Sequence, residues 1–156
     1  MTHRSAAHTS FVLERRFTAS PARVFRAWSD PVAKQRWSDC HAEVGTIEYS
    51  MDFRPGGREI HRAMLPTGAL QRIEKVFLEI VPDARIIFAY AMEAGGRSLS
   101  ASLVTTEFVG DGGGTLLRLT EQLAYLDGHD DLEERMRGTA EGLDRLLLEV
   151  EDLPTA

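Results

Sequence analysis

The sequence has very little cysteine, no long apolar run and no excess of basic residues. Cys40 is the single cysteine among 156 residues, which excludes an intrachain disulfide and favours a reducing, cytoplasmic location. No apolar run reaches the roughly 20 residues that a membrane-spanning helix needs, and the polar start, residues 1–10, lacks the apolar core of a secretory signal. With 18 basic and 24 acidic residues the net charge is −6, which argues against nucleic-acid binding, because such domains carry a basic face.

The remaining composition is that of a globular domain. The length fits one domain, and 43% of the residues are hydrophobic while 27% are charged. Thirteen glycines against six prolines indicate many tight turns and therefore many strands. We expect a flexible arm over residues 1–10 and a single domain over residues 11–152, with no cofactor, no metal and no insertion into a membrane.

Hydrophobic spacing predicts the order of elements: one strand, two short helices, about six strands and a long helix. Ser20-Pro21 and Asp30-Pro31 are start signals for the two short helices, because Ser and Asp side chains accept from free helix N–H groups and proline suits the first turn. Most of the chain after residue 44 alternates with a period of two, as strands do. The predicted strands cover residues 11–18, 44–53, 58–65, 70–81, 85–92, 99–109 and 115–125.

The C-terminal part predicts one helix of about five turns. Its apolar stripe consists of Leu132, Met136, Ala140, Leu143, Leu147 and Val150. Short turns favour hairpins, and a lone sheet must be covered on its apolar face. We therefore expect an α+β fold in which a curved antiparallel sheet of six to seven strands wraps around this helix. Gly138 and Gly142, beside the stripe, predict a close backbone approach by the first short helix, or alternatively by a second copy in a homodimer.

Several motifs in this order resemble those of a known superfamily. They are Ala19-Ser20-Pro21, Val24-Phe25, Ala27-Trp28, Asp30-Pro31, Arg36-Trp37, Asp52-Phe53-Arg54-Pro55-Gly56-Gly57, Ile80-Val81-Pro82-Asp83-Ala84-Arg85, Gly113-Gly114-Thr115, Leu117 and Thr120-Glu121-Gln122. The chain resembles the START-like helix-grip superfamily (SRPBCC), in the branch similar to the C-terminal domain of the activator of Hsp90 ATPase, which also includes polyketide cyclase-like proteins. The resemblance implies a cavity between sheet and long helix for an apolar or amphipathic small molecule, and no shared catalytic residues. Three residues depart from the aromatic side chains common in relatives: Ser38, Glu59 and His61.

The candidate ligand-binding residues are those that we expect to line this cavity. They are Trp37, Met51, Phe53, His61, Phe88, Tyr90, Met92, Ser102, Glu121, Met136, Thr139 and Leu143. Ser100, Ser102 and Thr106 share one strand face, which either points inward and leaves volume for a ligand, or points to solvent. A carboxylate at Glu121 would be costly at the end of a cavity unless it anchors a ligand or pairs with an arginine.

The direction of Glu59 and His61 depends on the turn before them. A two-residue turn pairs Met51 with Ile60 and places both side chains outside. A three-residue loop with a glycine bulge pairs Met51 with His61 and turns both inward, which the aromatic residues of the relatives favour.

Three functions remain in competition. The leading one is a module that binds a small apolar or amphipathic molecule. The second is a cyclase- or hydrolase-like enzyme that uses His61 as a general base, with Glu59 or Glu121 setting its state. The third is a co-chaperone of Hsp90, as the family name suggests. The glycine run 110–114 is a hairpin turn in this interpretation, and Cys40 has no assigned role.

Overall fold

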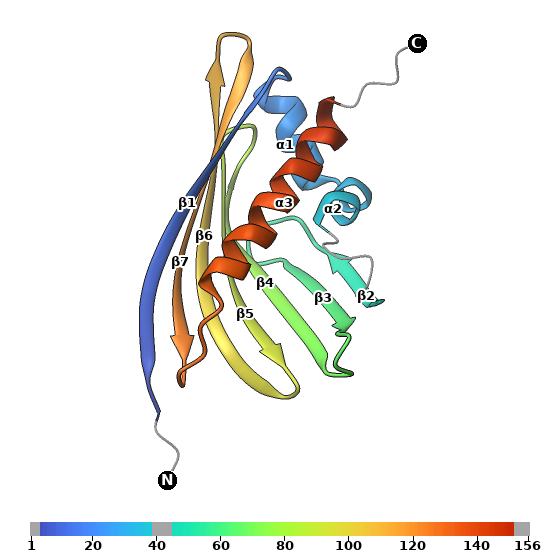
Figure 1. Cartoon of the computed structure of the whole chain (residues 1–156). Helices are drawn as coiled ribbons and strands as arrows, with labels where there is room; N and C mark the ends of the chain where they lie inside the picture. The colour runs from blue at the N-terminus through green and yellow to red at the C-terminus, as the bar shows by residue number, and fades with distance from the viewer. Residues whose placement is uncertain (1–3, 39–44, 152–156) are drawn as a thin grey trace.

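The structure is a computed structural model of the chain and describes residues 4–38 and 45–151, so Cys40 lies outside the described residues. The described part contains seven strands and three helices (Figure 1). The strands are β1 (Ala6–Phe17), β2 (Gly45–Met51), β3 (Arg58–Met64), β4 (Leu70–Val81), β5 (Arg85–Ala94), β6 (Arg97–Asp111) and β7 (Gly114–Leu126). The helices are α1 (Pro21–Ser29), α2 (Pro31–Ser38) and α3 (Leu132–Glu151).

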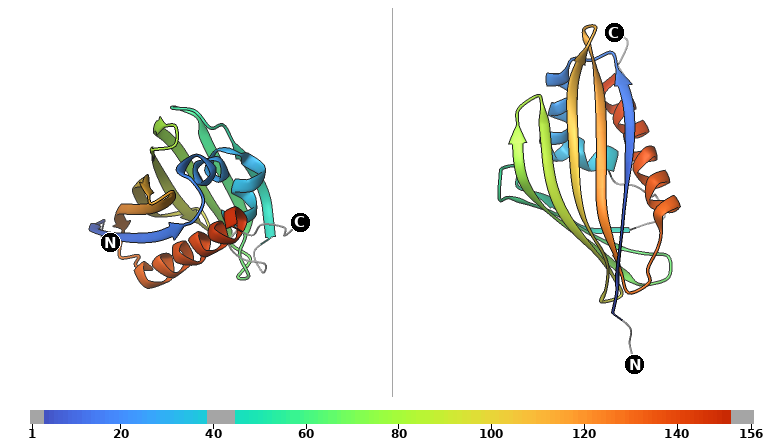
Figure 2. Two further views of the ribbon diagram at one scale, coloured as in Figure 1. Left: turned by 90° about the horizontal axis from the view of Figure 1, so that it is seen from above. Right: turned by 90° about the vertical axis from the view of Figure 1, so that its left-hand side faces the viewer.

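The seven strands form one antiparallel sheet in the order β1-β7-β6-β5-β4-β3-β2. Strands β2 to β7 follow one another as hairpins, and β1 pairs with β7 to complete the sheet. The sheet is curved, and all three helices lie on one side of it (Figure 2). We call this side the inner face. The predicted α+β fold, with its two short helices after the first strand and its long C-terminal helix, is confirmed.

The first strand begins earlier than the sequence predicted. Strand β1 starts at Ala6, which lies opposite Leu126 of β7, so residues 6–10 belong to the sheet and not to an arm. These residues are polar or small and mostly exposed. Because they bury little, they lack the alternation of apolar side chains by which a strand is recognised in a sequence.

Both short helices begin as predicted. The Ser20 hydroxyl accepts a hydrogen bond from the Arg23 N–H at the start of α1, and Pro21 occupies the first turn. The Asp30 carboxylate accepts from the Val32 N–H at the start of α2. The buried side of α1 consists of Val24, Phe25, Ala27 and Trp28. The two helices therefore cover one end of the inner face.

Helix α3 buries a face close to the predicted stripe. Leu143, Leu146 and Val150 are fully buried, and so is Gly142. The predicted close approach of α1 to these glycines is wrong, whereas the homodimer alternative stays a prediction. A Cβ atom at Gly138 would meet no neighbouring atom within 4 Å, and one at Gly142 would meet only Arg145 of the same helix, at 3.6 Å.

The β2–β3 connection turns Glu59 and His61 inward, but through a register that differs from both predicted ones. Met51 lies opposite Glu59 and Tyr49 opposite His61. Residues 52–57 form a longer connection, because Phe53 leaves the strand to pack against the rings of Phe25 and Phe77. The inward direction agrees with the alternative that the aromatic residues of the relatives favour. A register shift after Thr46 also leaves Ile47 51% exposed, instead of on the buried side.

Candidate functional site

One end of the inner face is filled with aromatic side chains. The rings of Phe25, Trp28, Trp37, Phe53, Phe77, Phe88 and Phe108 contact one another edge to face, with centroids 4.7 to 6.3 Å apart. All of them except Phe53 are fully buried. We call this region the aromatic end. Such packing leaves little unfilled space and stabilises the fold.

The other end of the inner face carries polar groups in two neighbouring rows of the sheet. Across strands β2 to β7, the residues opposite one another in the first row are Met51, Glu59, Lys75, Tyr90, Ser102 and Leu123. Those of the second row are Tyr49, His61, Ile73, Met92, Ser100 and Tyr125. We call these two rows, with the first turns of α3 above them, the polar end.

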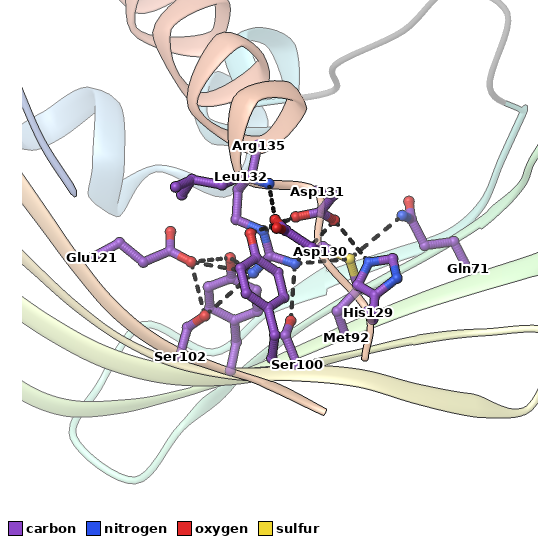
Figure 3. A network of polar contacts seen from close by, with 12 residues as sticks. Gln71, Met92, Ser100, Ser102, Glu121, His129, Asp130, Asp131, Leu132 and Arg135 are labelled. Carbon is purple, nitrogen blue, oxygen red and sulfur yellow. Dashed lines mark hydrogen bonds and ion pairs between the residues drawn. The ribbon is translucent and has the colours of Figure 1, made fainter. Parts of the chain in front are cut away.

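Arg135 in α3 is the centre of a buried network at the polar end (Figure 3). Its side chain is only 4% exposed and pairs with Glu121 at 3.3 Å and with Asp131, one turn earlier, at 3.1 Å. It also donates to the Ser100 hydroxyl at 2.9 Å and to the Ser102 hydroxyl at 3.4 Å. The two serines face inward, and the guanidinium occupies space that their small side chains leave.

Glu121 is the carboxylate on the far side of this network. Its Oε2 accepts hydrogen bonds from the hydroxyls of Tyr90 at 2.7 Å and Ser102 at 2.8 Å, and from Arg135. The predicted pairing with an arginine is therefore confirmed. Burial and the adjacent Glu121 carboxylate raise the pKa of Tyr90, so its hydroxyl stays protonated and can donate.

Asp131 links the network to the start of α3. Its carboxylate accepts from the Tyr125 hydroxyl at 2.7 Å and lies 3.1 Å from His129 Nε2. Burial alone would raise the pKa of Asp131, but the hydrogen bonds from Tyr125 and Arg135 outweigh it and lower the pKa. The Arg135 charge is thus shared between two carboxylates, and its donors all have acceptors.

A second charged cluster surrounds Glu59. The Lys34 ammonium of α2 contacts both carboxylate oxygens, at 2.8 and 3.0 Å, and the Tyr49 hydroxyl donates to Oε2 at 2.7 Å. Lys34 and Glu59 are almost fully buried, at 2% and 3% exposed. Lys34 also lies over the rings of Trp28 and Trp37, at 5.4 and 5.5 Å. The cluster therefore joins the polar end to the aromatic end.

Burial and charge act in opposite directions on this pair. Burial lowers the pKa of Lys34 to about 8, although the Glu59 carboxylate opposes this shift. Burial alone would raise the pKa of Glu59, but the ammonium groups of Lys34 and Lys75 hold it at about 2. We infer that Glu59 stays ionised over the whole physiological range.

The structure separates the predicted ligand-binding residues into three groups. Tyr90, Met92, Ser102 and Glu121 meet around Arg135. Trp37, Phe88 and Leu143 are fully buried in the core, whereas the half-buried ones are Met51, Phe53, His61, Met136 and Thr139. Sequence reasoning missed Lys34, Tyr49, Lys75, Asp131 and Arg135. A signal for Arg135 was available, because a buried Glu121 requires a cation and Arg135 precedes Met136 of the apolar stripe.

The geometry does not support an acid–base pair of His61 and Glu59. His61 lies on the inner face, with its ring 6.4 Å from that of Tyr49 and Nε2 3.5 Å from the Thr46 hydroxyl. The partners of Glu59 among the described residues are Lys34, Tyr49 and Lys75. The Glu59 carboxylate thus contacts two ammonium groups and a hydroxyl, and not the His61 imidazole.

Three hollows stand out among the described residues, and none lies between the inner face and the first turns of α3. One of about 710 Å³ is lined by residues of β1, β6 and β7, such as Leu103 and Gln122, that mostly face away from the helices. One of about 430 Å³ lies over β2 to β5, and one of about 160 Å³ lies among the three helices. None of these hollows corresponds to the predicted cavity between the sheet and α3, so that cavity is not shown among the described residues.

The residues that the structure describes are 4–38 and 45–151. They contain no group of three or more His, Cys, Asp or Glu side chains placed to hold a metal ion. None of their helices has the length and apolarity required to cross a membrane.

The comparisons with known proteins agree with the fold. Residues 18–152 match the family model described as Activator of Hsp90 ATPase homolog 1-like protein. An uncharacterised protein from Rhizobium leguminosarum is similar, with 46% identity, a TM-score of 0.92, and 97% of this chain and 100% of that chain covered. The Mll3558 protein from Rhizobium loti is 41% identical, with a TM-score of 0.86 and coverage of 93% and 99%. An AHSA1-like protein from Aeromonas hydrophila shares the fold, at 22% identity, a TM-score of 0.69 and coverage of 92% and 93%. No curated protein matches the chain.

Proposed function

The chain belongs to the family of Activator of Hsp90 ATPase homolog 1-like proteins, and from this premise we propose that it binds a small apolar or amphipathic molecule between the polar end of the sheet and α3. The family membership supports a domain whose long helix covers a curved sheet, but it names no ligand for this chain. The proposal therefore depends on the side chains of the inner face.

The observation that carries the proposal is the unequal burial of the inner face. Inward-facing apolar side chains of the polar end are only partly buried, among them Met51, Ile73 and Met92, and so is Met136 on α3. At the aromatic end all the rings except that of Phe53 are fully buried. Exposed apolar surface that is grouped on a concave face is typical of a binding site.

Burial of these side chains by a ligand would provide most of the binding free energy. Apolar surface removed from water contributes roughly 25 cal/mol per Å². The Arg135 network, whose hydrogen bonds are already made within the protein, would form a fixed polar boundary on one side. Such a site favours a molecule with an apolar body and few polar groups.

The test measures the binding of 1-decanol to the protein by NMR and calorimetry. We expect the methyl resonances of Ile73, Met92 and Met136 to shift on titration. Substituting Ile73→Gln should weaken binding about tenfold, because it removes roughly the apolar contact of one side chain. The matched control is Leu78→Gln on the same strand, since Leu78 is 54% exposed outside the core and should not affect binding.

A second measurement uses protein purified from its own host. Native mass spectrometry should detect a retained small molecule that is lost in the Ile73→Gln protein. Shifts confined to residues outside the inner face, or an equal loss of binding in both variants, would contradict the proposal. The enzyme and co-chaperone hypotheses stay predictions.

A further inference from the structure

We infer that the polar head of the ligand is a monoanion, of the carboxylate class, and that Lys75 binds it. This inference rests on the proposed function and adds the chemical class of the molecule. The sequence contains only two lysines, Lys34 and Lys75, among its 18 basic residues. Both lysines lie beside the same carboxylate, Glu59.

Glu59 accepts hydrogen bonds from only one of these two lysines. Lys34 contacts the two carboxylate oxygens at 2.8 and 3.0 Å, and Tyr49 donates to one of them. The Lys75 ammonium remains 3.7 Å from Oε1, which is an ion pair but too long for a hydrogen bond. Among the described residues no acceptor lies within hydrogen-bond distance of Lys75. Its three N–H donors are therefore available to another molecule.

The position of Lys75 suits the head of an amphipathic ligand. Its side chain points to the inner face, where Lys75 lies opposite Glu59 on one side and Tyr90 on the other. The ammonium lies 4.9 Å from the centre of the Phe88 ring. The side chain is 21% exposed, so it is largely surrounded by protein and still accessible. The partly buried Ile73 and Met92 lie in the adjacent row and would contact the apolar body of the ligand.

The charges at this position favour a single negative charge. Lys34, Lys75 and Glu59 together carry one excess positive charge, which costs free energy in a partly desolvated place unless an anion offsets it. A monoanion would neutralise the cluster, whereas a dianion such as a phosphate monoester would leave excess negative charge beside Glu59. The Arg135 network offers no comparable site, because its single cation already pairs with two carboxylates, those of Glu121 and Asp131 (Figure 3).

The experiment compares three probes with the same apolar chain: decanoate, 1-decanol and decyl phosphate. Calorimetry at neutral pH and constant ionic strength gives the affinity of each for the whole protein. We expect decanoate to bind at least tenfold more tightly than 1-decanol and more tightly than decyl phosphate. The Lys75→Met variant should bind decanoate and 1-decanol about equally.

Two further variants separate the site from general charge effects. Lys75→Arg keeps the positive charge and should retain most of the preference for decanoate. Arg72→Met removes a positive charge from the opposite face of the same strand, where Arg72 pairs with Glu74, and should leave the preference intact. If the preference for decanoate over 1-decanol falls as much in the Arg72→Met protein as in the Lys75→Met protein, the inference is overturned. Any nearby positive charge would then be enough to produce the preference.

The outcomes also distinguish a failure of the inference about the head group from a failure of the proposed function. Equal binding of decanoate and 1-decanol to the unmodified protein, or a preference that survives in Lys75→Met, rejects the role of Lys75 and leaves the proposed function standing. Tighter binding of decyl phosphate rejects the monoanion. If none of the probes shifts the resonances of Ile73 and Met92, the proposed function fails and the inference fails with it.

Discussion

The aromatic end and the polar end of the inner face share strands β4 to β6, yet they are stabilised by different means. At the aromatic end, rings such as Phe77 and Phe108 fill the space beneath α1 and are at most 5% exposed. At the polar end, buried charges are held by hydrogen bonds, while apolar neighbours such as Met92 and Met136 stay partly in contact with water. The same sheet thus carries a fully buried apolar core at one end and a partly exposed one at the other.

This difference separates stability from binding within one small domain. Tight packing of aromatic side chains contributes stability but leaves no room for another molecule. A region with fewer apolar contacts opens more easily, and binding sites are found in such regions. The polar groups of the second region are nevertheless almost all paired, which fixes the position of α3 over the sheet while apolar surface remains accessible.

The largest expected effect tests the packing difference directly. Phe77 is 2% exposed and contacts the rings of Phe53 and Phe88, so Phe77→Ala should lower the free energy of unfolding by about 4 kcal/mol. Met136→Ala, at the polar end, should cost only about 1 kcal/mol, because the methionine is half-buried in the absence of ligand. Urea unfolding followed by circular dichroism gives both values.

Equal losses for the two substitutions would contradict the comparison. They would mean that α3 packs as tightly over the polar end as α1 does over the aromatic end. The ligand sharpens the test, since a molecule bound as proposed should stabilise the unmodified protein more than the Met136→Ala protein.

The aromatic end was largely predictable from the sequence, and physical reasons explain this. Phe77 and Phe88 lie in apolar runs of strand length between turn signals, and Val24, Phe25 and Trp28 have helical spacing. Such a pattern is local, so it can be recognised in the sequence without knowing which residues pack together in the fold. The long helix was predictable for the same reason, since its stripe recurs every three or four residues from Leu132 to Val150.

The polar end was only partly predictable. The inward direction of Glu59 depended on a connection whose length no local pattern fixes, because Phe53 leaves the strand to reach Phe25 and Phe77. The pairing of Lys34 with Glu59 joins residues 25 positions apart on α2 and β3. A long-range ion pair leaves no periodic signal, and an isolated lysine in a short helix predicts a solvated surface.

A second prediction concerns the charges that connect the two ends. Lys34→Met should lower the free energy of unfolding by about 3 kcal/mol, because it leaves the Glu59 carboxylate buried with only Lys75 near it, at 3.7 Å. The double variant Lys34→Met/Glu59→Leu should recover most of this loss, since apolar residues of similar volume can replace a buried ion pair. Chemical unfolding of the single and double variants measures the coupling.

The pH dependence of stability provides the control for this pair. The pKa of Glu59 is about 2 in the folded protein and near 4.5 in its ordinary state, so ionised Glu59 contributes stability that is complete above about pH 4.5. This contribution is lost as the pH falls toward 2. The double variant has no Glu59 carboxylate, so it should not lose this part of its free energy of unfolding at low pH. An identical acid transition in both proteins would show that Glu59 is not specifically stabilised by the lysines.

The smallest expected effect concerns the part of α3 above the polar end. Gly138→Ala should raise the free energy of unfolding by up to about 1 kcal/mol, because alanine favours the helix and its Cβ would meet no neighbouring atom within 4 Å. Thermal unfolding measures this gain. Gly56→Ala is the contrasting substitution, since the φ of +82° at Gly56 strains an alanine and should lower stability. If Gly138→Ala also lowers stability, another surface covers this side of α3, and the polar end is more closed than its half-exposed side chains indicate.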